Sequence, residues 1–85
     1  NITMPASIPA TINRLDHTFR GASIFNQPIG TWDTTGVTLT RGMFSGASAF
    51  NQNIGDWNTA NVTNMFEMFK NATSFNQPLA NWIVF

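Results

Sequence analysis

The tripeptide Phe-Asn-Gln decides the fold, because it stands at residues 25–27, 50–52 and 75–77 of an 85-residue chain, 25 positions apart each time. Residues 25–49 and 50–74 are identical at 12 of 25 aligned positions, and the identities fall mainly on large apolar and turn-forming residues. A fixed period of roughly 20–50 residues is typical of proteins whose successive units stack on one another. We therefore expect side chains 25 positions apart to lie directly over one another.

Working outward from the tripeptide, the sequence predicts a single domain, 1–85. Upstream of the first tripeptide, Leu15 and Phe19 fall in register with Thr40 and Phe44, so half a unit precedes the two full ones. The predicted parts are an extended N-terminal segment at 1–11, a partial repeat at 12–24, repeats at 25–49 and 50–74, and a partial repeat at 75–85.

One half of each unit is predicted to be a short helix. Met65, Met68 and Phe69 have the i, i+3, i+4 spacing of residues that share one helix face. Asn64 and Glu67, three residues apart, have the form of a capping pair. The residues expected to end these helices in the left-handed conformation are Gly21, Gly46 and Asn71.

The other half, residues 50–59, favours a short bulged strand with its irregularity at Gly55, since its apolar residues recur at intervals of four and three. A strand and a helix in every repeat unit predict an α/β solenoid. The expected architecture is a leucine-rich-repeat-like stack of about three and a half coils, each a short strand plus a short helix.

The whole unit, FNQxIGxWxTxxVTxMxxMFxxAS, resembles the tandem repeat of BspA-like leucine-rich-repeat surface proteins of bacteria. The resemblance covers nearly all of the chain after about residue 12, and its motif consists mostly of core and turn residues. It implies an extracellular or surface-anchored protein that acts in adhesion or surface structure, and it carries over no enzymatic residues. Residues 1–11 and 83–85 depart from the repeat.

The composition excludes several classes of partner. Charged residues make up 9% of the chain, and four basic residues balance four acidic ones, so no field exists to attract nucleic acid or a membrane surface. No apolar run approaches the roughly 20 residues that span a bilayer. The chain has no cysteine, which excludes disulfides and thiolate metal sites. We expect no nucleic-acid partner and no direct membrane insertion.

Two kinds of repeated side chain could bind a ligand or could instead have a purely structural role. Aligned tryptophans offer a stacking platform for sugar rings, but a buried core column is the favoured interpretation. Aligned amides offer ligand contacts, but ladders of amide hydrogen bonds are favoured. The columns are Trp32, Trp57 and Trp82; Asn26, Asn51 and Asn76; and Gln27, Gln52 and Gln77.

No set of residues predicts catalysis. His17 is the single histidine and lies beside Asp16, but neither a nucleophile nor further metal ligands stand at suitable spacing. We therefore expect no enzyme activity, no catalytic residues, no metal and no cofactor. Asn61 and Asn71 lie in Asn-X-Thr triplets and are candidate glycosylation sites.

The ends of the chain are apolar where stacked arrays usually carry polar caps. A head-to-tail contact between such ends does not close and so produces filaments. The expected function is an extracellular or cell-surface structural protein that mediates protein–protein contact and assembles with copies of itself. The alternative is a fragment of a longer adhesin whose repeat face binds another surface protein or a glycan. The predicted self-assembly interface consists of Ile2, Met4, Pro5, Ile8, Trp82, Ile83, Val84 and Phe85.

Overall fold

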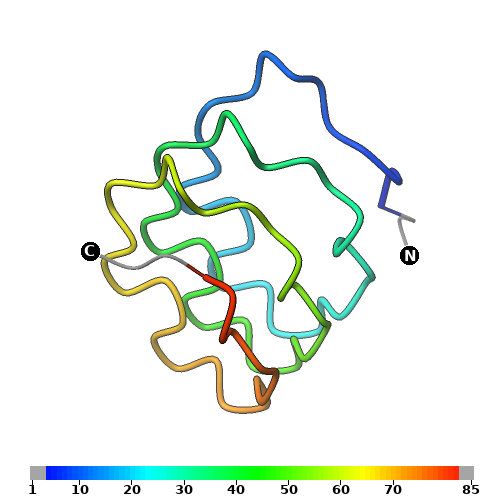
Figure 1. Cartoon of the computed structure of the whole chain (residues 1–85). Helices are drawn as coiled ribbons and strands as arrows, with labels where there is room; N and C mark the ends of the chain where they lie inside the picture. The colour runs from blue at the N-terminus through cyan, green and yellow to red at the C-terminus, as the bar shows by residue number, and fades with distance from the viewer. Residues whose placement is uncertain (1–3, 83–85) are drawn as a thin grey trace.

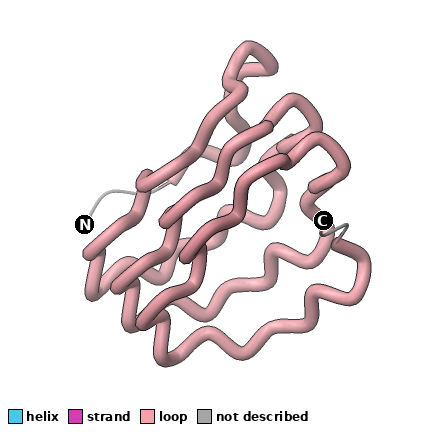
Figure 2. The backbone as a smooth tube through the Cα atoms, turned by 90° about the vertical axis from the view of Figure 1, so that its left-hand side faces the viewer, coloured by secondary structure: helices cyan, strands magenta, loops and turns pink. Residues whose placement is uncertain are grey.

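The computed structural model describes residues 4–82, in which the chain returns over itself at a regular interval (Figures 1 and 2). These residues contain no helix and no extended strand. Their β-type pairing consists of two isolated parallel bridges, Arg14 to Leu39 and Leu39 to Asn64. Each bridge joins equivalent positions of successive sequence units, so the period of the sequence is also the period of the structure.

Each passage of the chain through one such period, which we call a level, has two halves of different character. One half is a run of tight turns and the other carries most of the large rings. We call residues 12–24, 37–49 and 62–74 the turn segments, and residues 25–36, 50–61 and 75–82 the aromatic segments.

Every second amide of a turn segment donates a hydrogen bond to a carbonyl of the next turn segment along the chain. The amides between them donate three residues back, as Lys70 does to the Glu67 carbonyl at 3.2 Å. Four amides in each of the first two turn segments therefore hold successive levels together. The interlevel donors are Leu15, His17, Phe19 and Gly21 toward the second turn segment, and Thr40, Gly42, Phe44 and Gly46 toward the third, with N···O distances of 2.7–3.0 Å.

The predicted α/β solenoid of strand-plus-helix coils is wrong. An α-helix needs each amide to donate four residues back, whereas alternate amides here bond to another level. The middle of each turn segment also holds a residue at positive φ, namely His17 at 60°, Gly42 at 61° and Glu67 at 56°, which a right-handed helix does not accommodate. Two helical turns are unstable by themselves, so interlevel bonding prevails.

The terms solenoid, leucine-rich repeat and repeat fold therefore do not describe this structure. Its extents of 28 × 26 × 21 Å are nearly equal, and no level contains a strand-plus-helix unit among residues 4–82.

The predicted local motifs are replaced by side-chain-stabilised turns. Instead of capping a helix with Glu67, Asn64 accepts a hydrogen bond from the Phe66 amide at 3.0 Å through its own Oδ1. Instead of a bulged strand, residues 50–59 hold a turn in which Asn53 Oδ1 accepts from the Gly55 amide at 2.9 Å. Asx turns of this kind compete with regular secondary structure. The positive φ expected at Gly21, Gly46 and Asn71 is confirmed, at 73°, 75° and 62°.

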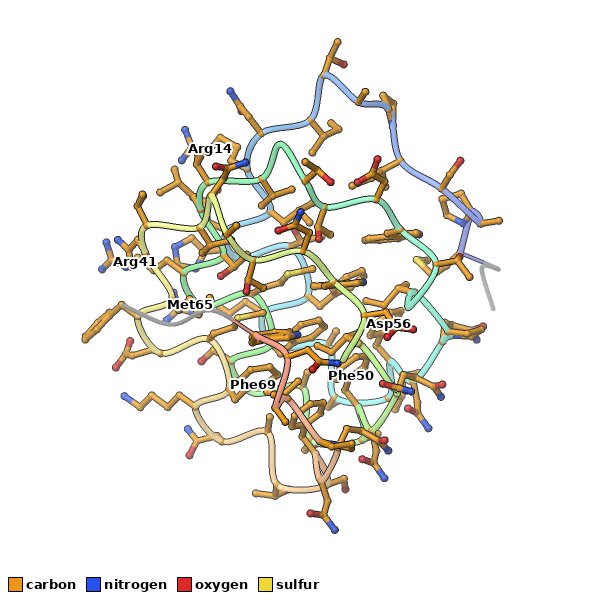
Figure 3. The ribbon with its side chains drawn as sticks, in the orientation of Figure 1. Arg14, Arg41, Phe50, Asp56, Met65 and Phe69 are labelled. Carbon is orange, nitrogen blue, oxygen red and sulfur yellow. The ribbon has the colours of Figure 1, made fainter. Side chains whose placement is uncertain are left out.

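The core combines aliphatic side chains with aromatic rings that stack in columns along the levels (Figure 3). Trp32, Trp57 and Trp82 lie 6.3 Å apart between centroids, with planes 5° from parallel, which confirms that side chains 25 positions apart overlie one another. Two phenylalanine columns flank them, with centroid spacings of 5.5–5.8 Å, and offset stacking adds to the energy of burial. These columns are Phe19, Phe44 and Phe69, and Phe25, Phe50 and Phe75.

Two glycines let adjacent aromatic segments approach closely. A Cβ added to Gly30 would collide with the Asn53 carbonyl oxygen of the next level, and one added to Gly55 would lie 2.9 Å from the Pro78 carbonyl oxygen. Gly36 differs, because its nearest backbone neighbours, the carbonyl oxygens of Ala10 and Ile12, would be 3.6 and 3.7 Å from an added Cβ.

We predict that Gly30→Ala destabilises the protein by about 2 kcal/mol, the order of other overpacking changes, because the collision is with backbone that cannot rotate away. Urea unfolding followed by tryptophan fluorescence measures the change. Gly36→Ala is the matched control and should shift the free energy of unfolding by less than about 1 kcal/mol. Equal destabilisation by the two variants would contradict the close approach.

Candidate functional site

The face of the last level is an apolar surface without a covering level in the described part of the chain (Figure 3). Its large side chains are half-buried, whereas the equivalent Phe44, Phe50 and Trp57 one level earlier are 0%, 0% and 3% exposed. The residues of this face, which we call the last-level face, are Met65, Phe69, Phe75, Leu79 and Trp82.

The last turn segment also presents unused backbone donors. Its amides at Met65, Glu67, Phe69 and Asn71 are equivalent to the interlevel donors of the second turn segment. None of these four amides has an acceptor within residues 4–82. The face therefore combines half-buried rings with a row of donors whose spacing is already used twice inside the protein.

The first turn segment presents the complementary row. The carbonyls of Arg14, Asp16, Thr18 and Arg20 are equivalent to those that accept interlevel bonds in the second and third turn segments. No amide of residues 4–82 donates to them. One end of the stack thus offers four donors and the other offers four acceptors in matching register.

The structure separates the residues predicted from sequence to form the interface. Met4 and Ile8 pack partly buried against the core, and the Pro5 carbonyl accepts a hydrogen bond from Trp32 Nε1 at 2.8 Å. Trp82 lies on the last-level face, at the opposite end of the stack. The predicted residues Ile2, Ile83, Val84 and Phe85 lie outside the described residues.

Most of the last-level face was not predicted as an interface. Met65, Phe69, Phe75 and Leu79 were interpreted as ordinary repeat positions because their equivalents form the core. The signal that identifies them is register: they are the final copies of core positions, so within residues 4–82 nothing follows to cover them. The unpaired backbone amides cannot be identified from the amino-acid sequence, because almost every residue carries a backbone amide.

The predicted amide ladder is confirmed along one edge of the aromatic segments. Asn26 Oδ1 accepts from the Asn51 amide at 2.9 Å and from Gln52 Nε2 at 3.0 Å. Asn51 Oδ1 accepts in the same way from the amide of Asn76 and from Gln77 Nε2. These side chains therefore set the register between levels.

The tryptophan column is core at Trp32 and Trp57, as predicted, whereas Trp82 is half-buried on the last-level face. Trp32 and Trp57 are buried. The indole Nε1 of Trp57 donates to the Ile29 carbonyl at 3.0 Å, and that of Trp82 donates to the Ile54 carbonyl at 3.0 Å. Both bonds reach back 28 residues and so join successive levels.

The charged groups form local pairs on the surface. Arg14 makes two hydrogen bonds of 2.8 Å to Asp16, which lower the pKa of the Asp16 carboxyl to about 2. Lys70 Nζ lies 3.0 Å from Glu67 Oε2. The Arg41 guanidinium lies 5.4 Å from the ring centroid of Phe66, a cation–π contact.

His17 packs against the next level. Its ring occupies the space beside Gly42, where an added Cβ would lie 2.6 Å from Nδ1. Within residues 4–82, no three histidine or acidic side chains gather closely enough to hold a metal ion. Nor does this range contain a helix of the length and apolarity that crossing a bilayer requires.

The two candidate glycosylation residues are both exposed. Asn61 Nδ2 donates to the Thr35 carbonyl at 2.6 Å, and so ties its level to the preceding one. Asn71 stands in a turn at a φ of 62°.

We predict that Arg14→Ala raises the pKa of Asp16 from about 2 toward 3.8, because the guanidinium no longer stabilises the carboxylate. The ion pair favours the folded state above pH 3.8, and its contribution disappears as the pH falls through about 2. NMR titration of the Asp16 carboxyl carbon measures this pKa. Lys70→Ala is the control and should leave it unchanged. A pKa near 3.8 in the unaltered protein would show that the pair does not form.

The protein-family comparison finds one match, to the family described as Mycoplasma protein of unknown function, DUF285, over residues 9–84. No curated protein and no solved structure matches the chain.

Proposed function

The chain belongs to the family described as Mycoplasma protein of unknown function, DUF285, and we propose that it is a structural surface protein that mediates protein–protein contact by stacking head-to-tail with copies of itself. The observation that carries the proposal is the complementary pair of backbone edges. The amides of Met65, Glu67, Phe69 and Asn71, which have no acceptor within residues 4–82, have the register of the carbonyl row on the first turn segment.

The apolar side chains support the same contact. Within the chain, a level placed over Phe44 and Phe50 buries both rings completely. A second copy placed over Phe69 and Phe75 removes comparable apolar area from water, at roughly 25 cal/mol per Å² before the cost of association. Because the two joined surfaces differ, the contact is heterologous and repeats without closing, which produces a filament.

An extracellular or cell-surface location is part of the proposal. It is supported by the resemblance of the 25-residue unit to that of BspA-like bacterial surface proteins and by the low charge of the chain, 9% of residues. At the cell surface the proposed role of the chain is structural: it forms protein–protein contacts and does not catalyse a reaction.

A second candidate is a role within a longer adhesin whose repeat face binds another protein or a glycan. The observation that favours it is the exposed edge of asparagine and glutamine side chains, in which Asn51 and Asn76 are solvent-facing. In that case recognition involves the edge of the levels, and the end faces are covered by neighbouring coils. The two candidates differ in whether the 85-residue chain associates by itself.

We predict that the protein associates at concentrations of tens of micromolar, and that Phe69→Asp reduces this association at least tenfold, because a charge then faces the joined surface. Sedimentation velocity over a dilution series measures the effect. Phe66→Asp is the matched control, since Phe66 is 58% exposed and lies outside the last-level face. It should leave association unchanged.

Thermal unfolding of the dilute variants separates loss of contact from loss of fold. If Phe69→Asp does not fold, Met65→Lys tests the same face at a half-buried position. A folded wild-type protein that stays monomeric throughout the series contradicts the proposal.

A further inference from the structure

Residues 4–82 form one more layer on the side of the aromatic segments than on the side of the turn segments. Residues 4–10 lie alongside the first aromatic segment, as the blue trace in Figure 1 shows, and occupy the position of a preceding layer. The Ile12 amide donates to the Pro9 carbonyl at 3.0 Å, as Val37 does to Thr34 one level later. Residues 4–82 therefore contain three turn segments but four layers beside them.

The hydrogen bonds to residues 4–10 resemble those between successive aromatic segments. Trp57 Nε1 reaches back 28 residues to the Ile29 carbonyl. Trp32 Nε1 reaches back 27 residues to the Pro5 carbonyl, at 2.8 Å. In addition, Thr31 Oγ1 donates to the Ala6 carbonyl at 2.6 Å. Residues 4–10 thus occupy the place of an aromatic segment with a slip of one residue.

This layer conflicts with rigid head-to-tail stacking. Suppose that the first turn segment of a second copy pairs with residues 62–74 in the same register as the turn segments within the chain. It then lies where a fourth turn segment of the first copy would lie, 75 positions after the first turn segment. The Pro5 carbonyl of the second copy then coincides with the Leu79 carbonyl of the first copy, so the segments that contain them fall in one layer. Both segments cannot occupy one layer, so one of them must leave before the turn segments can pair.

We propose, on the basis of the function proposed above, that residues 4–10 are a displaceable cap, and that residues 75–82 of one copy replace them on the next copy during assembly. The partner is a second copy of this chain, and the contact is an exchange of one layer. The cap covers the receiving surface in the free protein and so limits association.

The contacts within the chain indicate which segment leaves. Phe75 stacks on Phe50 at 5.8 Å and on Phe69 at 4.4 Å, and Trp82 stacks on Trp57 at 6.3 Å. Residues 76 and 77 add three hydrogen bonds to one asparagine of the level before.

The cap is held by fewer contacts. Its apolar anchors, Met4 and Ile8, are only partly buried, and two of its carbonyls accept side-chain hydrogen bonds. Pro5 and Pro9 have no N–H and cannot donate to a neighbouring layer. Residues 4–10 are therefore the weaker competitor for the shared place.

Residues 75–82 of the other copy supply acceptors for hydrogen-bond donors that the cap leaves without partners within residues 4–82. By the register of the other tryptophans, Trp32 Nε1 exchanges the Pro5 carbonyl for that of Leu79 in the other copy. The Asn26 amide and Gln27 Nε2 have no hydrogen-bond acceptor within residues 4–82, and they acquire Asn76 Oδ1 as the amide ladder continues. The exchange thus adds polar contacts to the apolar contacts of residues 75–82.

The test weakens the cap in the full chain. Met4→Asp with Ile8→Asp places two charges at the partly buried anchors, so the cap should detach and the apparent dissociation constant should fall at least tenfold by sedimentation velocity. Ser7→Asp with Ala10→Asp adds the same charge to the same segment at exposed positions. This control should associate like the wild type.

A second measurement returns the cap in trans. A synthetic peptide of residues 4–11 should inhibit association of the Met4→Asp, Ile8→Asp variant, and a peptide of the same composition in scrambled order should not. If the wild type associates and the variant associates equally or less, the cap is refuted and the proposed function stands. If neither protein associates at any concentration, both proposals are refuted.

Discussion

The backbone hydrogen bond that joins one turn segment to the next is the constraint on which the structure depends. It takes alternate amides away from any helix and directs them to carbonyls of the following level, as from Phe44 to Met68 at 2.8 Å. The chain must therefore return at every level with the same backbone path, including a left-handed residue at the middle of each turn segment. Side chains at equivalent positions are aligned as a consequence.

This alignment explains how a short chain without disulfides forms a core. Domains of this size bury a modest share of their surface, and aromatic rings supply large apolar areas at few positions. Nine rings stand in three columns, in which the middle ring of each column is buried and the outer rings, except the buried Trp32, are half covered. The stacking of levels buries the middle rings but leaves Phe69 and Phe75 on the last-level face. Stability and the proposed association therefore both depend on contacts between stacked levels.

The sequence predicted the period, the tryptophan core and the amide ladder, because each depends on side chains that recur in register. Apart from the left-handed residues Gly21, Gly46 and Asn71, it did not predict the local backbone. The spacing of Met65, Met68 and Phe69 suits a helix face and equally suits a run of turns whose apolar residues point inward. The left-handed position in the middle of the turn segments is glycine only at Gly42, and His17 and Glu67 occupy it in the other levels. No recurring glycine therefore indicated a positive φ there. The candidate site was predicted from apolar termini, whereas Met4 and Ile8 pack against the core and the donors of the last-level face belong to the backbone.

Hydrogen exchange of the monomeric protein, followed by NMR at high dilution, tests the interlevel bond most directly. The account predicts slow exchange for the amides of Phe19 and Phe44, which donate to Met43 and Met68, and fast exchange for the equivalent amide of Phe69, whose acceptor is absent from residues 4–82. All three amides belong to phenylalanine at the same place in the turn. Equal protection of Phe44 and Phe69, or fast exchange of Phe44, would contradict it.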